Sequence, residues 1–363
     1  MPMGPLEPVT GHVIDPQHAP DPALLAEVLP PHGTPSDAQL HRARATLTRL
    51  VAERHYRPLA SPCLLVVEID DGRHRATAVV GDLPIEAFHD GTVLPHEQVD
   101  EARVATLRRH LEVVGAVSTP VSLAHRDDER LAALVAELAA GTPHTRVTDG
   151  NVQTSLWVVD DEQARRRLAE AVAATDGWLI ADGHHRAAAG HVADRVLVAL
   201  APDSALTTRP FHRRVEITRT ASVAVSLLRE RGLAGEALPG PALPATAGEV
   251  VLAIDGQWWR VGLPEVAAAG AREQLDVVRA EAQVLAPLAV ALGTGAPPRP
   301  VAPDDDPSRL PADGTATVLL HPPTLAEVRR VAAAGQTLPA KSTYVVPKHR
   351  PGVLVVPRGG DLS

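Results

Sequence analysis

Apolar residues recur with helical spacing from Ser36 onward and form continuous runs soon after. A helix beginning at Ser36 or Asp37 would place on one face the side chains of Leu40, Ala43, Leu47, Leu50 and Val51. The runs "CLLVVEI" and "RATAVVG" then flank the turn dipeptide Asp71-Gly72, which predicts a β-hairpin. Residues 1–35, rich in Pro and His, show only weak periodicity. We therefore expect an N-terminal extension with one helix over residues 1–60, followed by the first strands of a sheet.

The middle of the chain alternates between helical and strand-like patterns. Asp100 is expected to begin a helix that runs to about Val114, and Asp127 or Asp128 to begin another that ends at Gly141. The segments "SLWVVD", "GWLIA" and "DRVLVAL" predict strands. The segment "DEQARRRLAEAVAA" predicts a helix between the first two of them, and a short helix follows the second.

A further series of elements starts near Thr218. A helix to about Arg231 precedes a hairpin around Asp255-Gly256, and another helix covers 273–291. "TATVLLH" predicts a strand, "TLAEVRRVAAAG" a helix closed by Gly335, and "STYVV" and "GVLVV" two short strands. Strands and helices alternate throughout, so the predicted class is α/β, in a mixed α+β arrangement.

Composition and charge exclude several classes of function. The formal net charge is −9 and the 363 residues include only 4 Trp, 2 Tyr and 2 Phe, which argues against nucleic acid as a partner. No apolar run approaches the length of a membrane span, and no signal peptide is visible, so we expect a cytoplasmic protein without a membrane partner. Cys63 is the only cysteine, in the apolar run "PCLLVVEI", and is expected to be a buried, inert thiol.

The stretch "WLIADGHHRAAAGH" carries the densest chemistry. Asp182-Gly183 forms a turn after a buried strand, and His184, His185 and Arg186 then occupy the first turn of a helix. Unpaired backbone N–H groups, the arginine fork and two imidazoles together suit a phosphate or another anion. A solvated polar helix cap is the alternative, and the residues alone do not decide between the two. Adjacent histidines point about 100° apart in a helix, which makes a shared metal ion the less favoured interpretation.

Two other polar clusters admit both a functional and a structural interpretation. In "VLPHEQ", Glu97 beside His96 suits a general base, although acids are common at helix starts. In "LPAKSTYVVPK", Lys341, Ser342 and Thr343 suit a phosphate or carboxylate, although for this segment alone an ordinary polar loop is the favoured interpretation.

Taken in order, five motifs resemble a large bacterial family of uncharacterised proteins related to the archaeal free serine kinases of the ParB/sulfiredoxin-like superfamily. They cover most of residues 60–356: "GTVLPHE" (91–97), "WVVDD" (157–161), "IADGHHR" (180–186), "PFHR" (210–213) and "PAKSTYVVPK" (339–348). The resemblance implies a ParB/sulfiredoxin-like nucleotide-binding domain over 61–217 and a C-terminal α/β domain over 218–363 that contributes to the site.

The resemblance also implies roles for individual residues. In the serine kinases the glutamate of the PHE motif is the catalytic base, which here is Glu97 with His96 beside it. Asp182, Gly183, His184, His185 and Arg186 would hold the phosphates of ADP, or of ATP, with Mg²⁺. Substrate contacts would come from Lys341, Ser342, Thr343, His212 and Arg213. The expected partners are thus a nucleotide and a small hydroxylated amino acid such as serine, and no residue is assigned as a metal ligand.

The sequence departs from the family pattern after the DGHHR motif, where Ala187 replaces an aromatic residue. The segment also differs from sulfiredoxins, whose nucleophilic cysteine is replaced by His184, and no basic recognition helix of the ParB type is present. The alternative function is a nucleotide-binding regulatory module without catalysis. A third interpretation is a metal-dependent hydrolase that uses His96, His184 and His185.

Overall fold

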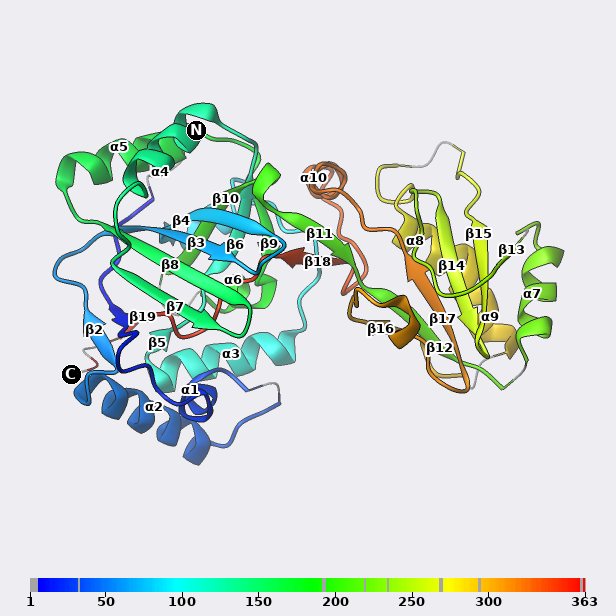
Figure 1. Cartoon of the computed structure of the whole chain (residues 1–363), viewed down its shortest axis with the longest axis horizontal. Helices are drawn as coiled ribbons and strands as arrows, with labels where there is room; N and C mark the ends of the chain where they lie inside the picture. Colours follow the sequence, from blue (N-terminus) through cyan, green and yellow to red (C-terminus); the bar gives the residue numbers. More distant parts are fainter. Residues whose placement is uncertain are drawn as a thin grey trace. The chain divides into compact units, whose positions relative to one another are not determined.

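The computed structural model describes residues 6–31, 33–190, 194–218, 220–233, 235–267, 270–292, 295–359 and 362. It divides into two compact units (Figure 1). Unit 1 comprises Met1–Pro95, Val99–Thr207 and Val346–Ser363, and unit 2 comprises His96–Gln98 and Thr208–Val345. The expected domain division at residues 60 and 217 stays a prediction, and the two units are the frame used below.

Unit 1 is built on a seven-stranded sheet in the order β7-β8-β3-β4-β10-β6-β9. Neighbouring strands are antiparallel except β10 and β6, which are parallel. The strands are β3 (Leu64–Asp70), β4 (Arg75–Pro84), β6 (Val121–His125), β7 (Thr145–Asp149), β8 (Val152–Val159), β9 (Leu179–Asp182) and β10 (Arg195–Pro202). The hairpin expected around Asp71-Gly72 is confirmed as β3 and β4.

A smaller sheet in unit 1 has the order β2-β1-β19-β5. Its strands are β1 (His12–Ile14), β2 (Tyr56–Pro58), β5 (Ala116–Val117) and β19 (Leu354–Pro357). The helices of unit 1 are α1 (Pro22–Val28), α2 (Asp37–Ala52), α3 (Glu101–Val114), α4 (Glu129–Leu138), α5 (Glu162–Ala173) and α6 (His184–Ala189), with short 3-10 turns η1 (Ile85–Phe88) and η3 (Asp203–Ala205). Because α1 and β1 lie within residues 1–35, that region is more regular than its weak periodicity predicted.

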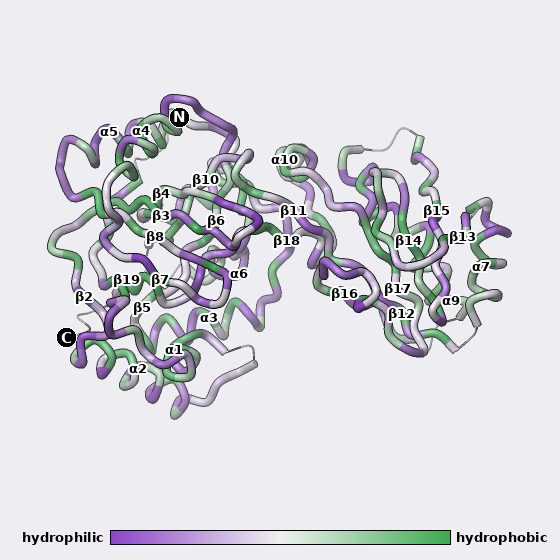
Figure 2. The backbone as a smooth tube through the Cα atoms, viewed as in Figure 1, coloured by the Kyte–Doolittle hydropathy of each residue, from purple (hydrophilic) through white to green (hydrophobic). Residues whose placement is uncertain are grey.

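The cores of unit 1 follow the apolar pattern of the chain. Leu131 and Leu134 of α4 and Leu168 and Val172 of α5 pack in one buried cluster with side chains of the seven-stranded sheet. The apolar face of α2 packs instead against α1 and the smaller sheet. Figure 2 shows hydrophobic residues gathered along the central strands, with hydrophilic residues at many of the connecting loops. Burial of apolar surface is the main stabilising contribution of such a core.

Local signals set the ends of several helices. The Ser36 side chain accepts from the Gln39 N–H while Gln39 reaches back to Ser36, a capping box that begins α2 as predicted. Asp100 and Asp128 cap α3 and α4 with side-chain oxygens that accept from backbone N–H groups. Helix α4 ends at Leu138, before the predicted Gly141.

Unit 2 is built on a six-stranded antiparallel sheet in the order β13-β15-β14-β17-β12-β16. The strands are β12 (His212–Glu216), β13 (Gly235–Leu238), β14 (Glu249–Ile254), β15 (Gln257–Gly262), β16 (Arg299–Val301) and β17 (Thr315–Leu320). A two-stranded sheet joins β11 (Thr207–Pro210) to β18 (Thr343–Val346). The hairpin expected around Asp255-Gly256 is confirmed as β14 and β15.

The helices of unit 2 are α7 (Ala221–Glu230), α8 (Asp276–Ala280), α9 (Ala286–Leu292) and α10 (Leu325–Ala333), with a 3-10 turn η5 (Pro307–Arg309). The single helix expected over 273–291 begins at Asp276 and is interrupted by the π-helical turn η4 (Glu281–Leu285). The chain is therefore a mixed α/β protein, as predicted. Among the described residues no helix has the length and apolar character needed to cross a bilayer.

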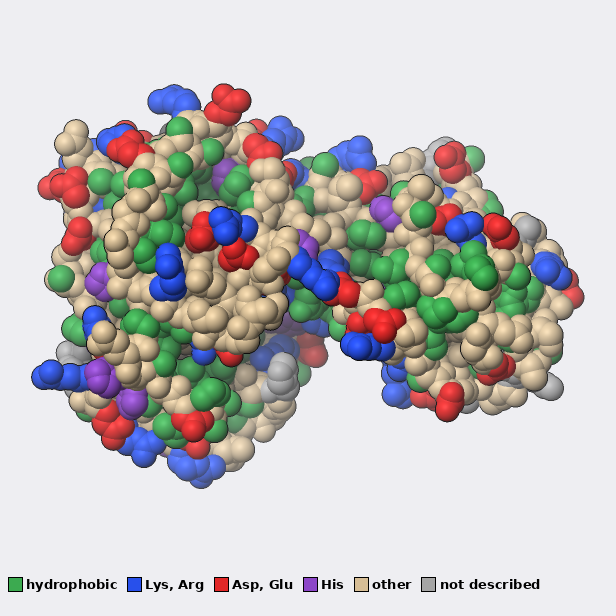
Figure 3. Space-filling model, in the orientation of Figure 1, with side chains coloured by type: hydrophobic (Ala, Val, Ile, Leu, Met, Phe, Trp, Pro, Cys, Tyr) green, Lys and Arg blue, Asp and Glu red, His purple; other side chains and the backbone are tan. Residues whose placement is uncertain are grey.

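Charged side chains of both signs are interspersed on the visible face of each unit (Figure 3). Neither visible face shows a large surface of one sign.

Candidate functional site

The turn between β9 and α6 depends on Gly183. Its φ of +103° lies in the region that favours glycine. A Cβ built on Gly183 would lie 2.7 Å from Nη2 of Arg186 and about as close to the rest of that guanidinium. The guanidinium therefore lies directly over the backbone of the turn, and any side chain at position 183 would displace it.

Asp182 holds two cations that come from distant parts of the sequence. Its Oδ2 accepts a hydrogen bond of 2.9 Å from Arg186 Nη2, and its Oδ1 accepts one of 2.5 Å from Lys348 Nζ. Arg186 Nη2 also donates to the Pro120 carbonyl at 3.1 Å. The residues of "IADGHHR" and the last lysine of "PAKSTYVVPK" thus meet inside unit 1.

The electrostatics of this cluster favour an added negative charge. Burial acts to raise the pKa of Asp182, but the charges of Arg186 and Lys348 outweigh it and hold this carboxyl ionised, with its pKa well below the ordinary value. Burial, assisted by the Arg186 charge, lowers the pKa of nearby His349 to about 4, so this imidazole is neutral near pH 7. Two cations and one carboxylate leave a surplus of positive charge.

A third cation, Arg103, extends this positive region. Burial, and after it the charge of Arg186, lowers the pKa of the Arg103 guanidinium. Arg103 donates to the Pro31 carbonyl, which fixes its position. Helix α6 has only 6 residues, so side-chain charge rather than the helix dipole is the main attraction for an anion here.

The two histidines of the motif differ in their surroundings. His184 is buried, whereas His185 is half-buried and its Nε2 accepts a 3.0 Å hydrogen bond from the backbone N–H of Asp100, the N-cap of α3. Since Nε2 accepts, the proton of a neutral His185 lies on Nδ1. This bond ties the start of α3 to the start of α6.

Ala187 packs into the interior of unit 1. Its side chain is only 4% exposed and belongs to the main core cluster of the seven-stranded sheet. A small residue therefore fits a position where an aromatic ring would have to displace core side chains. Beside Arg186, unit 1 also has a mainly apolar pocket of about 80 Å³, with Ser118 and Thr119 on its wall.

The predicted base lies in a short segment of unit 2, residues 96–98. Glu97 pairs with Leu338 in a parallel bridge, and the Leu338 N–H donates to the His96 carbonyl at 2.8 Å. The buried His96 ring makes a 2.9 Å hydrogen bond from Nε2 to Oγ1 of Thr343. Glu97 is half-buried, and these bonds fix the backbone that carries it.

Arg213 fixes the loop that carries Lys341. It is 3% exposed and donates to the carbonyls of Lys341 at 3.0 Å and Ala340 at 3.2 Å. Burial lowers the pKa of the Arg213 guanidinium, and the charges of Glu281 and Glu97 oppose that effect. These contacts position the loop. The substrate contact that the resemblance implies for Arg213 stays a prediction.

Ser342 and His212 are also turned toward the protein. Ser342 is buried and its hydroxyl donates to the Pro339 carbonyl at 2.5 Å. His212 is 1% exposed, and its Nδ1 accepts from the Leu320 N–H at 3.1 Å. Burial lowers the pKa of His212 to about 4, so this ring is a neutral part of the core. The substrate-binding role expected of these two residues stays a prediction, and in this structure their polar atoms bond to the protein itself.

Lys341 is the exposed member of the loop. Its φ of 57° places the residue in the left-handed region, and its Nζ lies 5.6 Å from the centroid of the Phe211 ring. Phe211 in turn makes an edge-to-face contact with Tyr344, with centroids 5.6 Å apart. The sequence analysis named Lys341 as a site residue, but it did not name either of the two aromatic residues beside it.

Sequence reasoning also missed Lys348, although it stands inside a quoted motif. One signal could have revealed it: of the 35 basic residues, only Lys341 and Lys348 are lysines, and both lie in that motif. The lysine ammonium is a compact charge with three hydrogen-bond donors. All other basic residues of this chain are arginines, so the two lysines stand out.

Asp182 is poorly placed to bind Mg²⁺ because its two carboxylate oxygens are already paired with Arg186 and Lys348. Both of its oxygens already accept from cations, and Mg²⁺ in nucleotide sites is held largely by phosphate oxygens, water and one or two carboxylates. An ion bound to the nucleotide phosphates would therefore enter with them rather than occupy a protein cage.

Comparison with known proteins gives the family. The model of the DUF1015 family, described as a protein of unknown function, matches residues 24–278. The chain belongs to this family. The expected membership in a family of uncharacterised proteins is thereby confirmed, while the ParB/sulfiredoxin-like superfamily stays a prediction. A search of curated proteins gave no match.

Solved structures show weak likenesses to this DUF1015 chain. SbnI with a C-terminal truncation, from Staphylococcus aureus, is 13% identical, with a TM-score of 0.43 over 77% of this chain and 87% of the other. A mutant free serine kinase in complex with ADP is 15% identical, with a TM-score of 0.41 over 77% and 92%. A conserved hypothetical protein from Pyrococcus furiosus is 15% identical, with a TM-score of 0.36 over 75% and 93%. Likenesses of this strength carry no argument about activity.

Proposed function

We propose that this protein transfers a phosphoryl group from a nucleoside diphosphate, ADP, to the hydroxyl of serine or a related small metabolite. The observation that carries the proposal is the Asp182 cluster, in which one carboxylate orients Arg186 and Lys348 from two separate motifs. The order of three of the motifs, those that contain Glu97, Asp182 and Lys341, resembles that of the free serine kinases and supports the same conclusion. ATP is the second nucleotide to be tested as donor.

In this proposal Arg186 and Lys348 bind the phosphates, and Asp182 positions the two cations. An arginine fork and a lysine ammonium are the side chains best suited to phosphate oxygens. The cluster has more positive than negative charge, so a polyphosphate would be attracted without a new arrangement of side chains. The Gly183 turn supports this role because only glycine lets the guanidinium lie over the backbone.

Glu97 is the proposed base. Its backbone is fixed by the bridge to Leu338 and, through His96, by the bond to Thr343. Lys341 is proposed to contact the carboxylate of an amino-acid substrate.

The reaction forms one bond and breaks one at phosphorus, and it moves one proton. The serine oxygen bonds to the β-phosphorus of ADP, and the bond from that phosphorus to the bridging oxygen breaks, so AMP leaves with the electron pair. The hydroxyl proton passes to a Glu97 oxygen. Such transfers depend mostly on positioning and charge neutralisation. A general base typically raises the rate by roughly 10²–10⁴-fold.

Phosphorus NMR on the full chain tests the proposal. Wild type is mixed with Mg²⁺, ADP or ATP, and serine, threonine and homoserine in turn, beside Glu97→Gln and an exposed control, Glu230→Gln. AMP and a phosphomonoester are expected from wild type and the control, but not from Glu97→Gln. Nucleotide signals that shift without product for any acceptor would support a nucleotide-binding module without catalysis. Phosphate release without an acceptor, abolished by chelation, would support a hydrolase.

A further inference from the structure

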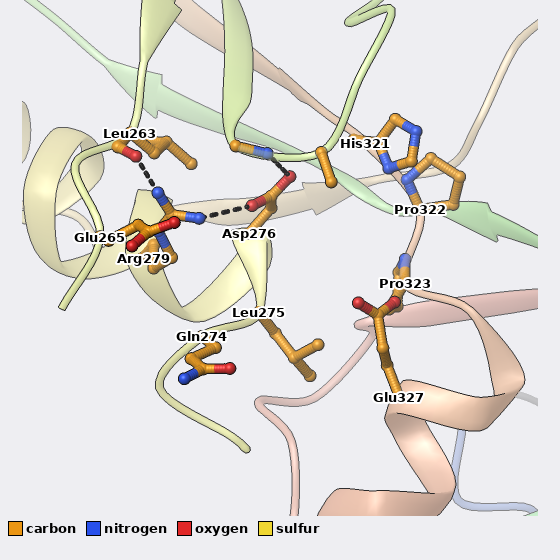
Figure 4. A pocket seen from close by; sticks show the side chains of 12 residues that line it. Leu263, Glu265, Gln274, Leu275, Asp276, Arg279, His321, Pro322, Pro323 and Glu327 are labelled. Carbon is orange, nitrogen blue, oxygen red and sulfur yellow. Dashed lines mark hydrogen bonds and ion pairs between the residues drawn. The ribbon is translucent and has the colours of Figure 1, made fainter. Parts of the chain in front are cut away.

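Unit 2 contains a pocket that shares no residue with the candidate site. It has a volume of about 420 Å³, within the size range of roughly 300–1,000 Å³ typical of small-molecule sites (Figure 4). Its walls come from the segment before β14, the segment after β15, the start of α8 and the link from β17 to α10. The pocket lies wholly within one unit.

A buried ion pair forms one wall of this pocket. Asp276 and Arg279 are 9% and 8% exposed, and Arg279 Nη1 lies 3.3 Å from Asp276 Oδ1. Asp276 Oδ2 accepts a 2.8 Å hydrogen bond from the Gly248 N–H, and Arg279 Nη2 donates to the Leu263 carbonyl. Both terminal nitrogens of the guanidinium are thus occupied, and its charge is compensated within the protein.

One polar atom of this pair is left without a partner. The buried Nε–H of Arg279 has no hydrogen-bond partner among the described residues. A buried donor of this kind costs free energy unless something accepts from it. Arg279 lines the pocket, and an oxygen acceptor on a bound molecule would reach the enclosed Nε–H only after a shift of the side chains around it.

The other polar groups of the pocket supply mainly acceptors. Figure 4 shows Glu265 and Glu327 on opposite sides of Asp276, with the His321 ring and the Gln274 amide also at the wall. Three carboxylates face one arginine, an excess of negative charge. Burial raises the pKa of Asp276, while the Gly248 hydrogen bond and the charges of Arg279 and His321 oppose that effect and the charge of Glu327 adds to it.

We propose that this pocket binds a small hydroxylated amine, of the amino-alcohol or amino-sugar class. The ammonium group would pair with Glu327 and Asp276, and a hydroxyl oxygen would accept from Arg279 Nε. Pro322 and Pro323 provide apolar walls for the carbon skeleton. The inference does not rest on the kinase proposal, because the two sites have no residue in common.

Three probes of one shape test the charge preference: glucosamine, glucose and glucuronate. Binding to the full chain is measured by calorimetry at low and at high salt. We expect one glucosamine per chain, weaker binding at high salt, and no binding of the neutral or the acidic sugar. Equal binding of all three probes, or no binding of glucosamine, would overturn the proposal.

Variants then locate the site. Glu327→Gln keeps the capping box with Thr324, since glutamine serves there as well, so the fold is retained. It removes one charge and should weaken glucosamine binding by about tenfold, the loss of a charge-assisted hydrogen bond. Asp276→Asn should act in the same direction. Glu230→Gln on α7 and Glu97→Gln should leave binding unchanged, and loss of binding in either would place the amine elsewhere.

Discussion

Replacing Lys348 by glutamine tests whether the Asp182 cluster binds phosphate. Lys348 Nζ lies 2.5 Å from Asp182 Oδ1, and the two side chains are 38% and 36% exposed. An ion pair this open to water contributes only about 0–1 kcal/mol to the free energy of unfolding. Lys348→Gln should therefore fold and melt almost as wild type does.

The effect on a nucleotide should be larger than the effect on folding. A unit charge about 4 Å from a phosphate oxygen gains about 4 kcal/mol at an effective dielectric constant of 20. Exposure of the ammonium reduces this toward the roughly 1.5–3 kcal/mol of a charge-assisted hydrogen bond. The dissociation constant for ADP should thus rise about 10- to 100-fold.

Calorimetric titration of ADP into wild type, Lys348→Gln and Lys348→Arg measures this difference. The arginine variant keeps the charge and should lose much less affinity than the glutamine variant. The gap between wild type and Lys348→Gln should narrow as salt rises, because added ions screen exposed charges. An unchanged dissociation constant in a folded Lys348→Gln protein would refute the reasoning from the ion pairs.

Three further outcomes follow from particular contacts. Gly183→Ala, whose Cβ would meet Arg186, should weaken ADP binding at least as much as Lys348→Gln does, in the same titration. Ala187→Phe should lower the free energy of unfolding by about 1–3 kcal/mol in urea titrations, since it overfills the core. His349 has a folded pKa of about 4, below its unfolded value near 6.5, so its neutral form stabilises the fold above that range and this contribution is lost as pH falls from about 6.5 to 4. His349→Gln should therefore flatten the fall in stability between pH 7 and 4.5, and an equally steep fall in the variant would contradict the assignment.

Elements set by local signals could be predicted from the sequence. The Ser36 capping box, the Asp100 cap and both hairpins depend on residues close together in the chain. Some short strands could not be predicted, because the strands with which they pair are far away in the sequence. β1 has only three residues and pairs with β19 at the far end of the chain, so no local pattern marks it. The π-helical turn η4 keeps a helical apolar pattern, which is why one helix was expected there.

The candidate site shows the same division. Motifs named the residues of the Asp182 turn and Glu97, but the pair of Lys348 with Asp182 joins positions 166 residues apart. At His212 and Ser342 the sequence could not show that neighbouring backbone groups form hydrogen bonds with these polar side chains. Hydrogen-bond partners of that kind depend on tertiary packing, which residue type alone does not report.

The most direct test of the central claim compares binding with turnover in one variant. ADP is first shown by calorimetry to bind wild type and Glu97→Gln equally. AMP formation is then measured in a single turnover with excess enzyme, Mg²⁺ and serine. The account predicts AMP and phosphoserine in equal amounts from wild type, and at least a hundredfold slower formation in Glu97→Gln, near the lower end of the roughly 10²–10⁴-fold contribution of a general base. Equal rates in the two proteins, or no phosphoserine from wild type with bound ADP, would contradict it.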